Sequence, residues 1–274
     1  EPEGPGELEL AKAAISAFTK SKTKAELFVG AQEREVLLAP VARIDEMLDM
    51  EHFRERDYWI QVQDPELGQV TAPGPWVKPS SGPLPTLAAP PALGQHTDEI
   101  KLPRTPFLPR TIDPVKANPR PLEGLKVVDT TWVYAGPFTT RILADMGATV
   151  IKVEGPNRPD AARSGGGGVN NDTTLDGSVQ FGTLNAGKTS LTLDLNVPEG
   201  QQTFRKLCDW ADIFIESYTP GTMDDWGMGY DVLRQTNPDL IMLSTSLMGA
   251  TGPLAKFAGF GNLAGALTGY YEVT

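Results

Sequence analysis

A predicted strand, a tight turn and a helix form the stretch of this sequence that is best suited to hold a ligand. The run Leu125–Thr131 is rich in strand-forming residues, and Ala135, Gly136 and Pro137 then lead into an apolar helix. The first N–H groups of a helix have no acceptor within it, so they favour a bound anion. The sequence therefore predicts an anion-binding turn here, and it leaves open which anion binds and for what chemistry.

A second stretch matches a nucleotide-binding pattern by its letters alone. Gly182–Thr189 fits the P-loop pattern of a glycine, four residues, a second glycine, a lysine and a serine or threonine. A P-loop lies between a strand and a helix that starts at the lysine. Here Ser190–Leu195 alternates between polar and apolar residues, as a strand does, and Pro198 follows. We therefore expect no ATP site in this stretch.

Three loops follow predicted strands and could contribute to a site. Asp160 and Arg163 come after one strand, where ligands bind in open α/β sheets, although a solvated ion pair explains them equally well. Ser217–Gly221 follows another strand, and Tyr218 offers an aromatic face to a base ring or simply packs in the turn. Gly165–Gly168 predicts a mobile loop near the site.

From Leu122 onward, strand and helix patterns alternate. Strands are expected at Val150–Val153, Thr189–Leu195, Asp212–Glu216 and Leu240–Ser246, with helices between them. Alternation at this spacing implies a parallel sheet that is covered by helices on both faces. The predicted fold class is therefore α/β, with a Rossmann-like sheet in the second part of the chain.

The first part of the chain predicts a small α+β segment followed by a proline-rich strap. One or two helices are expected within Glu7–Ala31, and Tyr58–Gln63 pairs with Gln69–Ala72 as a hairpin. Pro73–Leu93 is too rich in proline to be a helix or a central strand. Residues 101–120 are again rich in proline and are basic, so we expect a linker there between domains at residues 1–100 and 121–274.

The composition argues against several classes of function. A net charge of -11 disfavours nucleic acid and anionic membranes as partners. The sequence has no apolar stretch long enough to span a membrane, and we do not expect its first residues to act as a signal peptide, because they lack a basic region and an apolar core. The single cysteine, Cys208, lies in a helical pattern and is expected in the core, and His52 and His96 are the only histidines. We therefore expect a cytoplasmic protein without a disulfide bond, a zinc site or another metal site.

Residues 121–274 carry a series of short motifs in a fixed order. They are Leu122 with Gly124, Ala135-Gly136-Pro137, Leu143-Ala144-Asp145 with Gly147-Ala148, Val150 to Glu154, Asn185 with Lys188, Ser190 and Leu193-Asp194-Leu195, Pro198 to Gly200, Pro220-Gly221, Gly227 to Tyr230 and Gly249 to Pro253. Together they resemble the family III CoA-transferases, a group that includes formyl-CoA and carnitine CoA-transferases and α-methylacyl-CoA racemases. The resemblance also accounts for the accidental P-loop match.

Residues 33–100 resemble the closing segment of the same family. The similar stretches are Leu38–Val41, Asp64–Gly68, Pro73–Pro75 and Ala89–Thr97. The end of one transferase unit thus precedes the start of another. We expect a piece of a tandem fusion or a permuted gene, and the missing initiator methionine and the abrupt end at Thr274 favour the fusion.

The resemblance implies an enzyme that transfers CoA from an acyl-CoA to a carboxylic acid. In the family an aspartate attacks the thioester and forms a mixed anhydride, then an enzyme-CoA thioester, and an incoming acid leaves with the CoA. That aspartate follows the block matched by Phe260–Gly269, so we expect it beyond Thr274. We assign no catalytic residue within this chain and expect the chain alone to be inactive.

The resemblance also implies which residues contact CoA, which is a substrate here and not a permanently bound cofactor. The expected contacts are Tyr134, Ala135, Gly136, Pro137, Glu154, Ser217, Tyr218 and Asn262. Further partners are the acyl and acceptor acids and a second copy of the chain, or the other unit of a tandem chain, in an interlocked dimer.

Four positions depart from the family pattern. Tyr134 stands where glutamine is frequent, Ser217 where asparagine is common, and Gly155 and Asp225 where basic residues are common. Two positive contacts to the CoA phosphates are thereby lost, and Arg158, Lys152, Lys188 or a partner chain is expected to replace them.

Three alternatives to CoA transfer stay open from the sequence. The first is a racemase of the same fold, which would need a histidine and an aspartate for proton transfer beside the thioester. The second is a non-catalytic half of a tandem pair that serves as a scaffold, which the changes at Gly155 and Asp225 support. The third and most remote is an ATPase.

Overall fold

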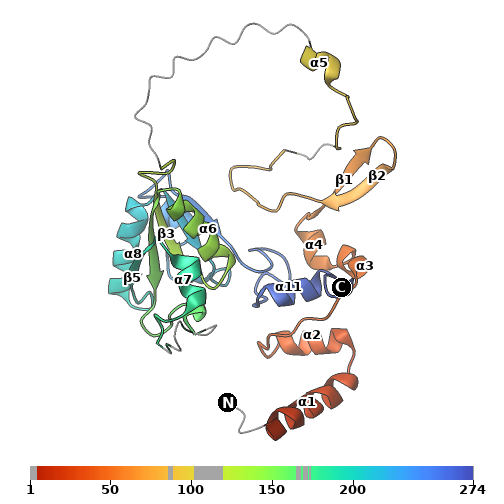
Figure 1. Cartoon of the computed structure of the whole chain (residues 1–274), viewed down its shortest axis with the longest axis horizontal. Coiled ribbons are helices and arrows are strands. Elements are labelled where there is room, and N and C mark those ends of the chain that lie inside the picture. The colour runs from red at the N-terminus through yellow and green to blue at the C-terminus, as the bar shows by residue number, and fades with distance from the viewer. Residues whose placement is uncertain are drawn as a thin grey trace. The chain divides into compact units, whose positions relative to one another are not determined.

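The computed structural model describes residues 5–85, 89–101, 120–164, 168, 172 and 174–273 (Figure 1). The chain divides into two compact units, one made of Glu1–Gln95 with Thr251–Thr274 and the other of His96–Ala250. The final segment thus groups with the first part of the chain. The sequence boundaries at residues 100 and 121 rest on the family pattern and stay a prediction. Nearly all of the expected linker and of Gly165–Gly168 lies outside the described residues.

The first unit is a small α+β arrangement. Its elements are α1 (Pro5–Lys20), α2 (Lys24–Gln32), α3 (Ile44–Leu48), α4 (Glu51–Glu55), β1 (Trp59–Asp64), β2 (Gly68–Pro73) and α11 (Gly261–Leu267). The strands β1 and β2 pair antiparallel as the expected hairpin. Residues 74–85 and 89–96 of the proline-rich stretch contain no helix or strand.

Segments from both ends of the chain pack together in this unit (Figure 1). The N–H of Ala42 donates to the carbonyl of Ala266, within α11, over 2.8 Å. His52 is buried, and its Nδ1 accepts a hydrogen bond of 3.0 Å from the N–H of Leu254.

The second unit is a five-stranded parallel sheet with its helices. Its elements are α5 (Thr97–Lys101), β3 (Lys126–Thr130), α6 (Ala135–Asp145), β4 (Thr149–Glu154), the 3₁₀ turn η1 (Ala161–Arg163), α7 (Val179–Asn185), β5 (Thr189–Thr192), α8 (Pro198–Trp210), β6 (Ile213–Glu216), α9 (Thr222–Asp225), α10 (Tyr230–Leu233) and β7 (Ile241–Ser244). The strand order is β5-β4-β3-β6-β7, and each neighbouring pair is parallel.

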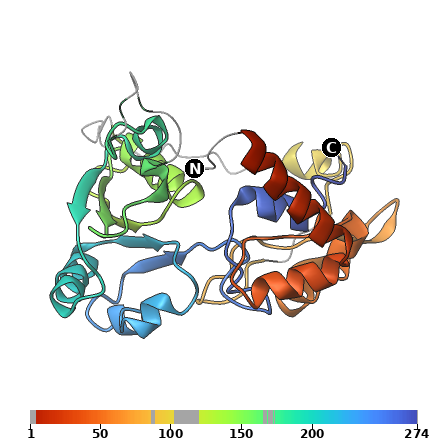
Figure 2. The same cartoon turned by 90° about the horizontal axis from the view of Figure 1, so that it is seen from below.

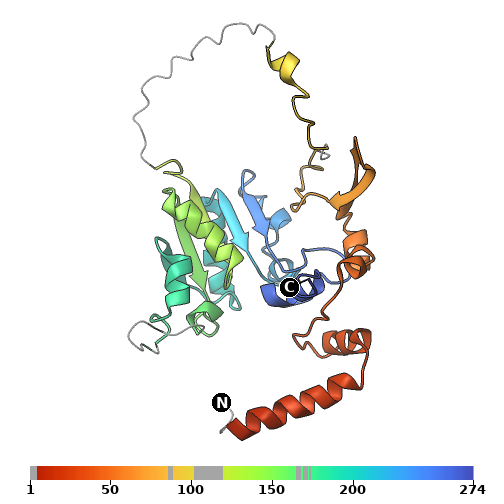
Figure 3. The same ribbon diagram turned by 45° about the vertical axis from the view of Figure 1, so that its right-hand side comes forward.

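Helices cover both faces of this sheet, with α6 and α7 on one side and α8 on the other (Figure 2). The helix α6 lies against β3 and β4 (Figure 3). Side chains alternate along β3, so Val128 faces α8 while Val127 faces α6. The predicted α/β class with a parallel sheet covered on both faces is confirmed.

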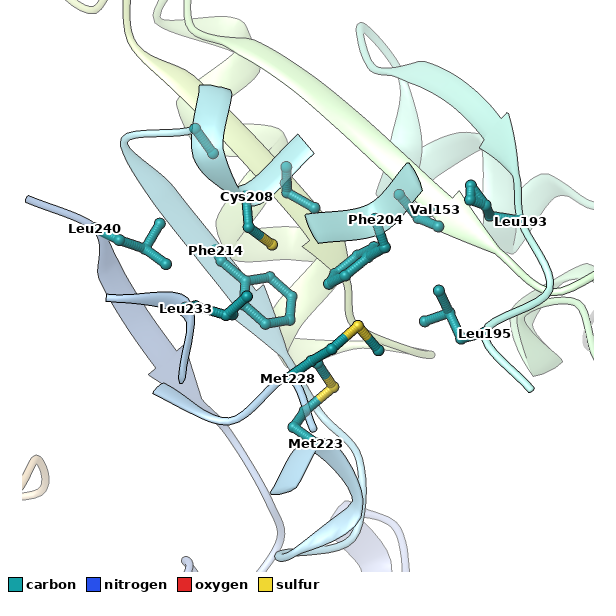
Figure 4. Packing of buried hydrophobic residues seen from close by; sticks show 12 residues of the cluster. Val153, Leu193, Leu195, Phe204, Cys208, Phe214, Met223, Met228, Leu233 and Leu240 are labelled. Atoms are coloured by element: carbon teal, nitrogen blue, oxygen red, sulfur yellow. The ribbon is translucent and has the colours of Figure 1, made fainter. Parts of the chain in front are cut away.

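The larger core cluster lies between the sheet and α8 (Figure 4). Phe204 and Phe214 meet edge to face there, with ring centres 5.2 Å apart. Cys208 is buried in the same cluster, and burial raises the pKa of its thiol to about 12. The prediction that this cysteine packs in the core is confirmed, and its burial disfavours the thiolate, the reactive form of a thiol.

The structure also confirms that the P-loop match is accidental. Gly182 lies inside α7, and the strand β5 begins at Thr189, directly after Lys188. The stretch therefore runs from helix to strand, the reverse of the order that a P-loop requires.

Two further observations concern membrane-spanning helices and metal sites. In the part of the chain that the structure describes, every helix is too short or too polar to cross a lipid bilayer. Among the same residues, no three histidine, cysteine, aspartate or glutamate side chains gather closely enough to hold a metal ion.

Candidate functional site

The topology of the sheet defines where a ligand would bind in the second unit. The chain runs outward from β3 through β4 to β5, then returns to the other side of β3 and continues through β6 to β7. The direction reverses between β3 and β6. In open α/β sheets, ligands bind outside the carboxyl ends of the strands at such a reversal. Here the two loops at that point are residues 131–134 and 217–221.

These two loops touch each other. The backbone N–H of Trp132 donates to Oγ of Ser217 over 2.9 Å, and Thr130 lies directly opposite Glu216 in the pairing of β3 with β6. The structure thus brings the predicted segments around Tyr134 and Tyr218 to one edge of the sheet. Tyr134 is 63% exposed beside this edge.

Tyr218 is less available than the sequence suggested. Its ring is half-buried and meets Trp226 edge to face, with 5.3 Å between ring centres. Burial is the main reason why its hydroxyl pKa is raised to about 12. Turn packing, the alternative reading of this residue, is therefore at least part of its role.

The N-terminus of α6 is open at the switch point. Ala135, Gly136 and Pro137 form the first turn of the helix, rather than a separate turn before it. Tyr134 occupies the capping position without a side-chain capping bond, and no acceptor among the described residues bonds the N–H groups of Ala135 and Gly136. Ala135 is exposed, whereas Gly136 is buried against Thr131, so the N–H of Ala135 is the donor left for an external anion.

A buried carboxylate lies directly beneath this turn. Asp129 is fully buried and accepts from the N–H and the hydroxyl of Thr131, at 2.8 and 2.6 Å, and from the hydroxyl of Thr140 at 2.6 Å. Lys188 Nζ lies 2.9 Å from Oδ2, the oxygen that also accepts from Thr140. Burial alone would raise the pKa of Asp129, but Lys152, Lys188 and the threonine hydroxyls outweigh it and the pKa is lowered.

A second pair of buried charges supports the same turn. Lys152 Nζ lies 3.0 Å from Asp160 Oδ2 and also donates to the carbonyl of Thr131. Asp160 Oδ1 accepts from the N–H of Val133 at 3.0 Å and from that of Ala162 at 2.9 Å. Both charged side chains are about as buried as the core, so their charges must compensate each other.

Glu154 and Arg163 extend this network. Two nitrogens of Arg163 donate to the two carboxylate oxygens of Glu154, at 2.8 and 2.7 Å, and the N–H of Asp160 donates to the same carboxylate at 3.0 Å. Burial opposes ionisation of Glu154, but these donors lower its pKa on balance. Since both oxygens are occupied, these contacts do not favour the predicted role of Glu154 as a direct CoA contact, which stays a prediction.

The buried charges bear on the predictions for the loop of Asp160 and Arg163 and for the two lysines. Asp160 and Arg163 do not form the solvated ion pair of the alternative interpretation: Asp160 pairs with Lys152 and Arg163 pairs with Glu154, and both pairs are buried. Lys152 and Lys188 were two of the four candidates to contact the CoA phosphates, beside Arg158 and a partner chain. The structure disfavours these two, because each lysine side chain is buried and held by a carboxylate.

Asn262 belongs to the other unit. It is exposed as the second residue of α11, and its carboxamide oxygen accepts from the N–H of Leu263 at 3.0 Å. Its predicted contact with CoA stays a prediction.

Arg158 and Trp132 form a feature of the site that sequence reasoning only partly foresaw. The guanidinium of Arg158 lies 5.0 Å from the centre of the Trp132 ring. Its positive charge favours ionisation of the Tyr218 hydroxyl and so partly opposes the rise in the pKa that burial causes. Arg158 is exposed and forms no ion pair with any described residue. A cation that stacks on an aromatic face is held in place while its N–H donors remain free.

Glu216 is a buried carboxylate at the end of β6 that no cation neutralises among the described residues. It accepts from the N–H of Tyr218 at 2.6 Å. Burial is the largest cause that raises its pKa, and Asp224 adds to the rise, while hydrogen bonds from Ser244 and Tyr218 oppose it.

Replacing Glu216 with glutamine should therefore change stability in a pH-dependent way. A folded-state pKa above the ordinary 4.5 means that the wild-type protein loses stability as pH rises from that value through the folded-state pKa. Glutamine does not ionise, so Glu216→Gln should gain relative to the wild type across this window and then hold its gain. Urea unfolding at a series of pH values measures the difference, and a difference that is independent of pH would contradict the assignment.

The fold and the geometry of the switch point can be set against known proteins. Residues 5–97 and 122–274 match the family described as CoA-transferase family III, so the chain belongs to this family. It is 40% identical over 156 residues to a succinyl-CoA–D-citramalate CoA-transferase of Chloroflexus aurantiacus, which covers 57% of this chain and 38% of that protein. It is 37% identical over 156 residues to a succinyl-CoA:glutarate CoA-transferase of Mus musculus, covering 57% of this chain and 35% of that protein.

Solved structures give the same picture of partial similarity. A CaiB/BaiF family protein from Brucella suis is 38% identical, with a TM-score of 0.48, over 52% of this chain and 38% of that chain. A hypothetical protein from Mycobacterium tuberculosis is also 38% identical, with a TM-score of 0.46, over 52% of this chain and 38% of that chain. The chain thus spans well under half the length of the relatives that it matches.

Proposed function

We propose that this chain supplies the CoA-binding part of an enzyme that transfers CoA between an acyl-CoA and a carboxylic acid. The observation that carries the proposal is the open N-terminus of α6 at the switch point, in a chain that belongs to the family III CoA-transferases. The exposed N–H of Ala135 suits an anionic ligand.

The proposed reaction proceeds through a carboxylate of the enzyme. The carboxylate oxygen bonds to the acyl carbon of the thioester, the C–S bond breaks and CoA thiolate leaves. The thiolate then attacks the enzyme carbonyl of the mixed anhydride, which releases the donor acid and leaves an enzyme-CoA thioester. The acceptor carboxylate attacks this thioester, CoA thiolate leaves again and a second mixed anhydride forms. Attack of the thiolate on the acceptor acyl carbon of that anhydride gives the new acyl-CoA and restores the enzyme carboxylate.

The described residues at the switch point do not offer that nucleophile. Asp129, Asp160 and Glu154 are buried and are held by lysine or arginine side chains. Glu216 is buried beneath the turn that carries Tyr218. This supports the inference that the attacking aspartate is a residue other than these four.

The relatives suggest which substrates to test first. Several are named for succinyl-CoA as the donor, with D-citramalate, glutarate or L-malate as the acceptor. We infer that the donor and acceptor of the whole protein are small carboxylic acids of this kind. Two relatives are named as the alpha and beta subunits of one CoA-transferase, which supports pairing with a second unit.

Arg158 is proposed as the contact to the CoA phosphates. Gly155 and Asp225 remove the two basic residues that the family usually has, and Lys152 and Lys188 are buried in ion pairs. Arg158 is exposed beside the switch point, and its stacking on Trp132 leaves the guanidinium donors free. A guanidinium fork matches a phosphate in both geometry and charge.

The full chain is therefore expected to bind CoA, and Arg158→Gln should weaken the binding about tenfold, which corresponds to ~1.4 kcal/mol. Isothermal titration calorimetry with free CoA measures both dissociation constants. The loss should shrink at high salt, because an exposed charge contact is screened.

Arg234 provides a matched control for this test. Its guanidinium also stacks on an aromatic ring, that of Tyr230 at 5.4 Å, but on α10. Arg234→Gln should leave the affinity for CoA unchanged. A wild-type chain that does not bind CoA would overturn the proposed function, and equal losses in both variants would remove only the role of Arg158.

A further inference from the structure

The turn before α6 contains a residue in an unfavourable backbone conformation. Val133 has φ = 65°, in the left-handed region. This region is costly for any residue other than glycine, and a β-branched side chain makes it a clear outlier. Because Val133 directly precedes the capping residue Tyr134, its conformation sets the direction in which the chain enters the helix.

Contacts from outside the turn hold Val133 in this conformation. Its N–H donates to Asp160 Oδ1 over 3.0 Å, across 27 residues of sequence. The other oxygen of Asp160 lies 3.0 Å from Lys152 Nζ, which also donates to the carbonyl of Thr131. Asp160 and Lys152 therefore hold the turn by two hydrogen bonds, one to the N–H of Val133 and one to the carbonyl of Thr131.

Asp160 and Lys152 are themselves fixed in place by burial and by further hydrogen bonds. Asp160 has no exposed surface, and Lys152 is 1% exposed. The N–H of Asp160 donates to Glu154, which Arg163 holds through two hydrogen bonds. A buried ion pair costs much desolvation and is weak evidence for stability. The contacts of this pair, however, end on a strained backbone, and strain of this kind persists where the surrounding structure over-determines it and clusters at ligand sites.

We propose that Asp160, with Lys152, is a positioning residue that fixes the turn at residues 131–134 in the conformation that binds CoA. The inference rests on the proposed function, since it names a residue that acts on the same site without touching the ligand. Holding Val133 in place keeps the start of α6, with the exposed N–H of Ala135, in a fixed position for the anion. The free chain thereby carries the cost of ordering the turn before CoA arrives.

A double substitution separates positioning from stability. Asp160→Ala removes the acceptor for the N–H of Val133, so the turn should relax and the dissociation constant for CoA should rise about tenfold. Glycine adopts a left-handed conformation without a steric cost. Adding Val133→Gly to Asp160→Ala should therefore lower the dissociation constant for CoA at least threefold relative to Asp160→Ala. The melting temperature should stay low, because the buried ion pair is still missing.

Two further variants keep the test decisive. Leu240→Ala makes a cavity in the core cluster and lowers the melting temperature without touching the turn, so its CoA affinity should follow the wild type. If Asp160→Ala does not fold, Asp160→Asn replaces it. Its carboxamide oxygen can still accept from the N–H of Val133, but the ion pair with Lys152 is lost. The melting temperature should therefore fall, while the affinity for CoA should change little.

The outcomes distinguish the two proposals. A wild-type chain that binds no CoA overturns both. A wild-type chain that binds CoA, with Asp160→Ala binding equally well, overturns the positioning role alone. The same holds if Asp160→Ala binds weakly and Val133→Gly restores nothing, or if Leu240→Ala loses as much affinity at the same melting temperature.

Discussion

Replacing Asp129 with alanine should cost about 3–5 kcal/mol of folding free energy, the range for a buried charge pair that loses one partner. Asp129 has no exposed surface, and its removal leaves Lys188 buried without its carboxylate. It also takes the acceptor from the hydroxyls of Thr131 and Thr140. Urea unfolding of the full chain measures the loss.

The loss should depend on pH with a defined sign. The folded-state pKa of Asp129 lies below its ordinary 3.8, because lysines and hydroxyl donors outweigh the effect of burial. The stabilisation is then complete above the unfolded-state pKa and disappears as pH falls through the folded-state pKa. The difference in unfolding free energy between wild type and Asp129→Ala should be largest near about pH 5 and should narrow below about pH 4, as Asp129 becomes protonated.

Asp176 offers the control. It pairs with Arg163 at 2.7 Å, but its side chain is 92% exposed. Exposed pairs contribute about 0–1 kcal/mol, so Asp176→Ala should have little effect. If the two aspartate variants lose similar amounts, the buried network does not stabilise the fold in the way its geometry implies.

The elements of the sheet could be predicted because their signals are local. Asp212–Glu216 is a short apolar run between a helix and a turn, and β6 occupies Ile213–Glu216 of it. Pro198 marks a helix start, and α8 begins there. Such patterns need no knowledge of what lies beside them in space.

The burial of charge could not be predicted in the same way. Asp129 and Lys188 are 59 residues apart in sequence, and the pairing of Lys152 with Asp160 depends on how the chain turns after β4. A lysine in a strand reads as a solvent-facing residue, so Lys152 looked free for a phosphate. One signal was present: Lys152 and Asp129 both interrupt apolar strands that are expected to be buried on both faces.

The site itself was only partly readable. Its loops follow from the topology, because the carboxyl ends of parallel strands meet at one edge. The conformation of Val133 carries no sequence signal, since a valine there is compatible with an ordinary extended chain. Its left-handed geometry arises from the acceptor that Asp160 supplies, 27 residues further along the chain.

Replacing Gly136 with alanine should destabilise the second unit by about 1–3 kcal/mol, the usual cost of overpacking, and should also weaken CoA binding. A Cβ at this position would lie 2.3 Å from Cβ of Thr131 and 2.6 Å from its hydroxyl oxygen. Thr131 cannot move away freely, because its N–H and hydroxyl are bonded to buried Asp129. The added methyl group must therefore shift the turn or the start of α6, which carries the proposed anion donor.

Gly182 tests whether this effect is specific to the turn. It also lies within a helix, α7, and a Cβ there would meet no atom within 4 Å. Alanine is the better helix former by about 1 kcal/mol, so Gly182→Ala should leave stability unchanged or raise it. Thermal unfolding and CoA titration of both variants make the comparison. If Gly136→Ala behaves like Gly182→Ala in both measurements, then Thr131 and the turn have room to adjust, and the close approach of the helix start to β3 does not shape the site.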